Sequence, residues 1–166
     1  ECHLLLGGTK PDHYNGNLLL SYLLGATIHF TGENRKGEDI ETLKKKLESE
    51  GKKVYVVPYG GSNLTGALGF VEAVRELKEQ LLKMDLSIDY LFFASSSGGT
   101  QAGLILGKEL YGLNAELMPV SIDKEKIQGR STEEIIYELV NEGKKLLNLE
   151  KEFTLEQIGL IREYNE

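Results

Sequence analysis

The stretch YLFFASSSGGTQAGLILG, residues 90–107, decides the fold of this chain. An apolar run from Tyr90 to Ala94 stops at the small residues Ser95–Thr100, and an apolar pattern with helical spacing follows. Short apolar runs are typical of buried strands, whereas helices repeat their apolar residues every three or four positions. The pattern therefore predicts a strand, a tight loop and a helix.

The loop Ser95–Thr100 has no side chain large enough to cover its backbone N–H groups. The first four N–H groups of a helix have no partner within the helix, and the helix dipole places partial positive charge there. We therefore expect the loop to bind an anion, and a phosphate in particular. The residues that would contribute hydroxyl donors and permissive backbone are Ser95, Ser96, Ser97, Gly98, Gly99 and Thr100.

A simpler alternative for this loop is a capped helix start, with glycines that serve only close packing. The loop matches neither nucleotide motif, because it lacks a G-K-[ST] ending and a G-x-G-x-x-G run.

Size and charge place the chain among ordinary folded proteins. It has 166 residues, of which 40% are hydrophobic and 27% charged, with a formal net charge of −7. The acidic balance argues against nucleic acid as a partner, because phosphate backbones are bound by concentrated Lys and Arg. The run Lys44–Lys46 lies among glutamates on a predicted helix, where a solvated face is expected.

The chain has one cysteine, Cys2, and so cannot form an internal disulfide, which is typical of a reducing compartment. No apolar run approaches the length of a membrane span. We expect a cytoplasmic protein without a membrane partner. The chain starts at Glu1, inside an apparent strand, and this abrupt start suggests a truncated or processed product.

Apolar runs and helical patterns alternate along the chain, which predicts an α/β fold of mostly parallel sheets flanked by helices. We expect Asp123–Arg130 to be a charged loop, and His29 to be a packed residue rather than a ligand. The expected strands are Cys2–Leu6, Thr27–Phe30, Val54–Val57, Tyr90–Ala94 and Asn114–Ile122. The expected helices are Leu18–Leu24, which we expect to pack, Asp39–Glu50, a helix from about Thr65 to Met84, one ending near Tyr111, one beginning with a capping box at Ser131, and a last helix or partial helix within Phe153–Tyr164.

A second glycine-rich stretch, YGGSNLTGALGF, covers Tyr59–Phe70. Gly60–Asn63 must be irregular backbone at the carboxyl end of the expected strand Val54–Val57. Ligands collect at the carboxyl ends of strands in parallel α/β sheets. The alternative is that these glycines only make a tight crossover.

Three stretches together resemble the fold type II pyridoxal-phosphate enzymes, in the branch of D-cysteine desulfhydrase and 1-aminocyclopropane-1-carboxylate (ACC) deaminase. They are NGNLLLSYLLGA at Asn15–Ala26, VVPYGGSNLTGALGF at Val56–Phe70 and ASSSGGTQAGL at Ala94–Leu104. The residues of these stretches, their order and their spacing all agree with the family over most of residues 1–110.

The resemblance implies that Ser95–Thr100 holds the phosphate of pyridoxal 5′-phosphate and that Asn63 lies at the cofactor. It implies parts of two domains, a smaller substrate-side domain at 1–57 and a larger cofactor-side domain at 58–166. It also implies a small amino acid as substrate, ammonia release by elimination, and a homodimer.

Two family motifs are missing. The lysine that bonds the cofactor aldehyde lies in a Gly-Asn-Lys context, and a Ser-Asn-His segment follows it; neither occurs here. Lys10, in GGTKP, lacks the required neighbours and is not assigned this role. We therefore expect no catalytic residue in this chain, and a central fragment that is inactive alone, with portions of the parent enzyme missing at both ends.

Two other functions stay open. A sugar-phosphate-binding module, as in phosphosugar isomerase domains, would use a similar serine-rich loop and would need no lysine, but it would not explain Gly60–Asn63. A non-catalytic remnant that folds and binds a partner is the third possibility.

Overall fold

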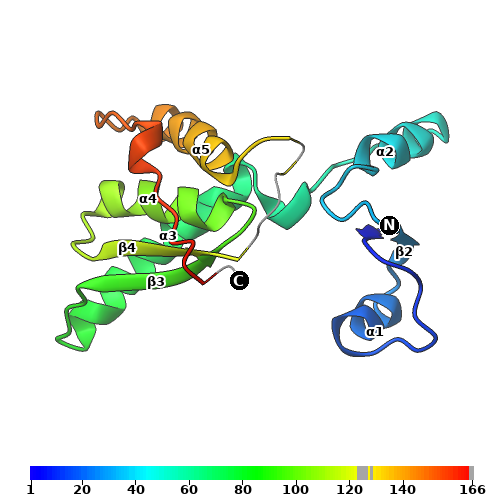
Figure 1. Ribbon diagram of the computed structural model, residues 1–166, viewed down its shortest axis with the longest axis horizontal. Helices are drawn as coiled ribbons and strands as arrows, with labels where there is room; N and C mark the ends of the chain where they lie inside the picture. Colours follow the sequence, from blue (N-terminus) through cyan, green and yellow to red (C-terminus); the bar gives the residue numbers. More distant parts are fainter. Residues whose placement is uncertain (123–126, 128, 165–166) are drawn as a thin grey trace. The chain divides into compact units, whose positions relative to one another are not determined.

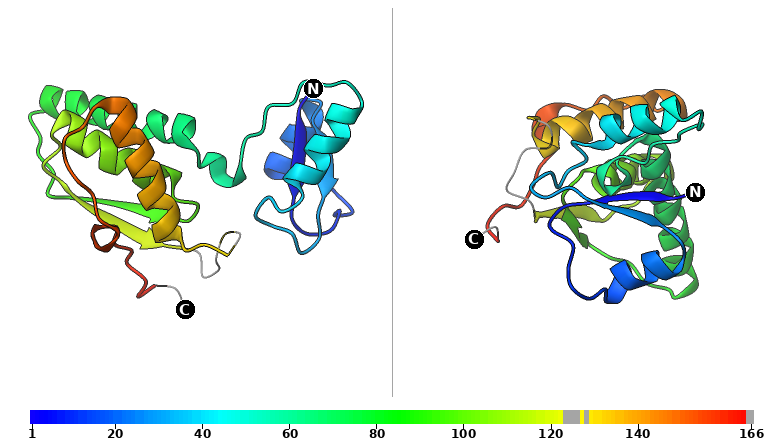
Figure 2. Two further views of the ribbon diagram at one scale, coloured as in Figure 1. Left: turned by 90° about the horizontal axis from the view of Figure 1, so that it is seen from above. Right: turned by 90° about the vertical axis from the view of Figure 1, so that its right-hand side faces the viewer.

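The computed structural model describes residues 1–122, 127 and 129–164. By its internal contacts the chain divides into two compact units, Glu1–Tyr59 and Gly60–Glu166. Figures 1 and 2 show the elements of both units.

The first unit is built on two parallel strands. Strand β1 pairs with β2 in parallel from His3 opposite Thr27 to Leu6 opposite Phe30. Both strands confirm the sequence predictions, and so do both helices. The elements are β1 (His3–Leu6), α1 (Gly16–Leu23), β2 (Thr27–Phe30) and α2 (Ile40–Ser49).

Helix α1 forms as predicted, but the prediction that it packs is wrong for this structure. None of its residues is buried. Leu20, Leu23 and the capping Leu24 are 56%, 68% and 87% exposed. Residues Gly16–Leu24 thus expose apolar side chains that the rest of the first unit does not cover.

The predicted strand Val54–Val57 is absent: this segment has no ladder partner among the described residues. Local sequence favours an extended chain here, but a strand exists only when a neighbouring backbone supplies its hydrogen bonds. The missing partner, and not the sequence VYVV, therefore explains the difference.

The second unit contains a parallel pair of strands with helices. Its elements are η1 (Tyr59–Gly61), α3 (Leu64–Lys83), β3 (Tyr90–Ser95), α4 (Gly99–Tyr111), β4 (Glu116–Ser121), α5 (Thr132–Leu147) and η2 (Leu155–Gln157). Strand β3 pairs in parallel with β4 from Tyr90 opposite Glu116 to Ser95 opposite Ser121. Ser131 forms the predicted capping box with Glu134. Parallel pairs flanked by helices confirm the predicted fold class.

One face of the β3–β4 pair is covered by helices α3 and α4, as the two views agree (Figures 1 and 2). Leu91 and Phe93 pack against the buried cluster of Val74, Leu104, Leu113 and Ala115. Tyr90 and Phe92 alternate with them and are 56% and 64% exposed. A second core cluster joins α3, α4 and α5 through Val71, Ala102, Leu106, Ile136 and Val140.

A helix or partial helix was predicted within Phe153–Tyr164, and most of this segment is not helical. Only a short 3₁₀ turn, Leu155–Gln157, is helical. Ile161 then forms a parallel bridge to Val120 in β4, with Ser121 N donating to Ile161 O at 2.8 Å. Long-range pairing with an open strand edge has replaced the local helix. The predicted loop Asp123–Arg130 falls largely outside the described residues.

Candidate functional site

The loop between β3 and α4 has the predicted form. Strand β3 ends at Ser95 and α4 begins at Gly99. Gly98 caps the helix with a φ of 92°, a left-handed value that favours glycine. A Cβ at Gly98 would lie 2.9 Å from Ile136 Cγ1, so the site also lacks space for a side chain.

The two glycine-rich stretches of the sequence meet through Ser62. Ser62 Oγ donates to Ser97 Oγ at 2.7 Å and accepts from Gly99 N–H at 3.0 Å. A Cβ at Gly60 would lie 2.0 Å from Ser97 Oγ, so the approach of the two segments requires glycine there. We call Ser62, Ser97 and the α4 N-terminus the hydroxyl cluster. The sequence analysis had not singled out Ser62, although it lies in the GGSN segment.

The direction of these hydrogen bonds determines which groups a ligand would meet. Because Ser97 Oγ accepts from Ser62, its own proton is left to donate onward. The N–H of Gly99 is already satisfied by Ser62, whereas those of Thr100 and Gln101 have no acceptor among the described residues. The N-terminus of α4 has no acidic residue in its first turn. The cluster is thus rich in donors, as an anion requires.

Asn63 caps helix α3. Its Oδ1 accepts from Gly66 N–H at 2.8 Å, which leaves the Nδ2 group without a partner among the described residues. Nδ2 is the donor that a ligand oxygen would use. The predicted contact of Asn63 with a cofactor stays a prediction.

Gln101 and Ser95 form a buried polar link that the sequence analysis missed. Both residues are 2% exposed. Ser95 Oγ donates to Gln101 Oε1 at 2.7 Å, and Gln101 Nε2 donates to Gly159 O at 2.9 Å. The hydroxyl of Ser95 therefore holds the loop from inside, and its predicted contact with a phosphate remains untested. A single amide in an otherwise apolar helix start was the signal available in the sequence.

The loop is also held by α5. Thr132 Oγ1 donates to Ser96 O at 3.2 Å. Thr100 is half-buried in the first turn of α4, and its hydroxyl has no partner among the described residues. A ligand oxygen can therefore take up the Thr100 hydroxyl without breaking a bond inside the protein.

The hydroxyl cluster fits a phosphate, and no hydrogen bond of the described residues brings a lysine amine to it. Lys78 and Lys108 direct their amines to the backbone carbonyls of Tyr111 and Ala115. The described cluster thus has donors suited to a phosphate, while the absence of a catalytic lysine from this chain stays a prediction from the sequence.

Within the part of the chain that the structure describes, no cluster of three or more His, Cys, Asp or Glu side chains is placed to hold a metal ion. None of its helices combines the length and apolar character needed to cross a membrane.

A match to a known family gives the class of this protein. Residues 1–146 match the family described as "Pyridoxal-phosphate dependent enzyme", and the chain belongs to this family.

Two curated relatives and a crystal structure narrow this further. The chain is 45% identical over 114 residues to the "Bifunctional D-cysteine desulfhydrase/1-aminocyclopropane-1-carboxylate deaminase, mitochondrial" of Arabidopsis thaliana, covering 64% of this chain and 28% of that protein. It is 36% identical over 137 residues to a "Putative 1-aminocyclopropane-1-carboxylate deaminase" of Pyrococcus abyssi, covering 81% and 41%. The structure of an "ACC deaminase homologue" superposes with a TM-score of 0.73 at 28% identity, covering 90% of this chain and 45% of that one.

These matches agree with the family resemblance of the three sequence stretches. The chain spans less than half the length of the relatives that it matches.

Proposed function

We propose that the hydroxyl cluster binds the phosphate of pyridoxal phosphate, and that this chain is part of a lyase or deaminase acting on a small amino acid. The observation that carries the proposal is the donor relay from Gly99 through Ser62 to Ser97 at the N-terminus of α4. Membership of the pyridoxal-phosphate family supports this choice of phosphate over a sugar phosphate.

Each residue of the cluster has a defined part in this proposal. Ser97 and Thr100 would donate their hydroxyl protons, and the N–H groups of Thr100 and Gln101 would complete the cradle. Asn63 would add its Nδ2 donor. The cofactor, when bound, supplies the electron sink for bond cleavage next to the substrate amine, while the protein supplies binding and orientation.

Substitution of Thr100 by Val tests the cradle. It removes one hydroxyl donor with little change in shape, so phosphate binding should weaken by about 1–3 kcal/mol, roughly 5- to 150-fold. Calorimetric titration with pyridoxal phosphate and with inorganic phosphate measures this. Thr42→Val, the same change on an exposed position of α2, is the control. Equal affinity of the Thr100 variant and the wild type for both probes would refute the assignment.

Gly98→Val should abolish binding more completely. Its side chain would meet Ile136 and would enter a backbone conformation that valine avoids. Because this variant also strains the fold, circular dichroism must show native helix content before a loss of binding is attributed to the cradle.

The substrate and the assembly belong to the whole protein and are proposed here. D-cysteine or ACC is the proposed substrate, because the relatives carry these names. The expected reaction releases ammonia, which a coupled assay on the complete enzyme detects with either compound. We further propose a homodimer and a cytoplasmic location, to be tested by light scattering and by fractionation.

The domain assignment is also a proposal. Residues 1–57 would be part of the smaller, substrate-side domain, and residues 58–166 part of the larger, cofactor-side domain. The division of the chain into the compact units Glu1–Tyr59 and Gly60–Glu166 supports a boundary in this region. The phosphate cradle lies wholly in the second unit, which supports its cofactor-side role. Pyridoxal phosphate should therefore still bind when the first unit is proteolytically removed.

A further inference from the structure

The segment Val54–Val57 has the character of a strand without a partner. Its sequence, VYVV, is composed of residues that favour β-structure. Its exposure alternates, with Val54 and Val56 half-buried and Tyr55 and Val57 77% and 64% exposed. Yet among the described residues Lys53–Val57 makes no backbone hydrogen bond. An alternating, extended segment with unused donors and acceptors is prepared to enter a sheet.

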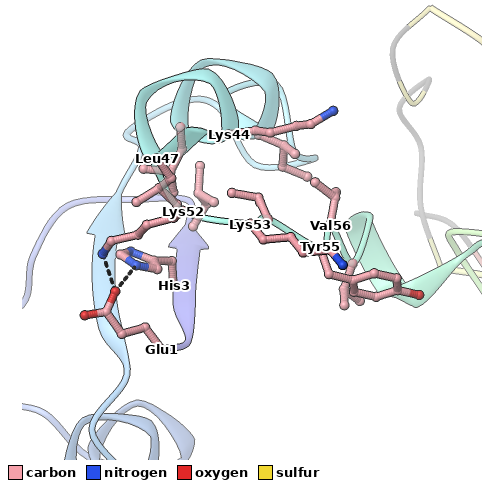
Figure 3. A pocket seen from close by; sticks show the side chains of 13 residues that line it. Glu1, His3, Lys44, Leu47, Lys52, Lys53, Tyr55 and Val56 are labelled. Atoms are coloured by element: carbon pink, nitrogen blue, oxygen red, sulfur yellow. Dashed lines mark hydrogen bonds and ion pairs between the residues drawn. The ribbon is translucent and has the colours of Figure 1, made fainter. Parts of the chain in front are cut away.

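A hollow separates this segment from β1. The hollow has a volume of about 500 Å³ and is lined by His3 and Leu5 of β1 and by all four residues Val54–Val57 (Figure 3). Its third wall is one face of α2, formed by Ile40, Leu43 and Leu47. We call this hollow the strand groove.

The groove lies where one more strand of the sheet would fit. Along one edge β1 pairs with β2, and along its other edge it has no partner among the described residues. Helix α2 connects β2 to Val54–Val57, as the helix of a parallel crossover does. If Val54–Val57 were the neighbour of β1, the two would pair directly, but the groove keeps them apart.

Helix α2 already provides the cover that such a strand would need. Ile40, Leu43 and Leu47 follow one another at spacings of three and four, so they share one face of the helix. His3 and Leu5 alternate along β1 and point to the same side of the sheet. A strand between β1 and Val54–Val57 would place every second side chain against this apolar surface.

We propose that an extended, apolar β-strand occupies the strand groove and joins β1 to Val54–Val57 in one parallel sheet. The proposed source is polypeptide that the longer relatives possess outside the part matched here, since the match of 137 residues covers 41% of the Pyrococcus abyssi relative. The groove takes this strand through backbone hydrogen bonds on both edges and apolar contacts to α2.

The lysine charges at the rim of the groove favour an occupying strand that carries a carboxylate. Three lysines line the groove: Lys44, Lys52 and Lys53. Lys52 is paired with Glu1 and Lys44 with Glu41, whereas Lys53 has no carboxylate partner among the described residues. The occupying strand should therefore carry an acidic residue at one of its ends. This inference does not depend on the phosphate cradle, which lies in the other unit.

Overlapping peptides of about a dozen residues, tiling the unmatched part of the Pyrococcus abyssi relative, test the proposal on the 166-residue chain. One apolar peptide should bind and should slow hydrogen exchange at the amides of both Leu4–Leu6 and Val54–Val57. Binding of no peptide, or protection of only one of the two segments, would overturn the proposal.

Proline variants supply the decisive control. Neighbouring residues of a strand direct their N–H groups to opposite edges, so one of Tyr55→Pro and Val56→Pro should weaken peptide binding at least tenfold. The matched variants Tyr55→Thr and Val56→Thr keep the N–H and should bind within about threefold of the wild type. Unchanged exchange in the β1–β2 pair confirms that the proline variants fold.

Two results would contradict the groove as a strand site. Full peptide affinity in both proline variants would exclude backbone pairing. Protection of Val54–Val57 without peptide, together with a dimer in light scattering, would show that a second copy of the chain covers the groove instead.

Discussion

The close approach of α3 and α4 predicts opposite changes in stability for two glycine-to-alanine variants. Gly103, on α4, faces α3 so closely that a Cβ would lie 2.2 Å from Ala67 O and 2.5 Å from Phe70 Cβ. The first of these atoms belongs to the backbone, so no rotamer change can relieve the contact. Gly69, on α3, has open space where its Cβ would be. Both glycines lie inside helices.

Gly103→Ala should destabilise the second unit. Overpacking of a tight core costs about 1–3 kcal/mol, and a clash with backbone belongs at the upper end. Replacing glycine inside a helix recovers roughly 0.5–1 kcal/mol. The expected net loss is thus about 2 kcal/mol. Gly69→Ala introduces no clash and keeps the favourable helix propensity of alanine, so it should stabilise the same unit by about 0.5–1 kcal/mol.

Hydrogen exchange of the slowest amides of α4 reads out these changes, because they open only when the unit unfolds. Calorimetry gives a second measure, with a midpoint shift of roughly 4 °C or more per kcal/mol for a domain of this size. If Gly103→Ala proves as stable as Gly69→Ala, the two helices do not approach as closely as described, and the reasoning fails.

Two further predictions concern a buried amide and a histidine. Gln101→Leu leaves the buried Ser95 hydroxyl without its acceptor and should cost about 2–4 kcal/mol by urea unfolding. The control Gln80→Leu changes an exposed amide of α3 that has no side-chain hydrogen bond among the described residues, and it should cost less than about 1 kcal/mol; equal costs would contradict the buried link. Burial lowers the pKa of His29, and His3 lowers it further. Below about pH 6.5 the imidazole of His29 is therefore protonated more readily in the unfolded chain than in the native one, so the first unit should lose stability as the pH falls. The variant His29→Asn should reduce this pH dependence of stability in unfolding experiments between pH 5.5 and 8.

Local sequence was sufficient where the structure depends on neighbours along the chain. The capping box at Ser131, the helix Gly99–Tyr111 and the glycine at its start were all predictable. Their hydrogen bonds join residues three or four positions apart, so the residues that specify them lie within a short window. The loop between β3 and α4 was recognisable for the same reason.

Tertiary structure decided everything that needed a distant partner. Ser62 reaches Ser97 and Gly99 across more than thirty residues, which no local pattern reveals. Val54–Val57 has the sequence of a strand but pairs with none of the described residues, while Ile161, predicted as helix, pairs with β4. A helix carries its hydrogen-bond partners within its own sequence, whereas a strand depends on whichever backbone the fold places beside it.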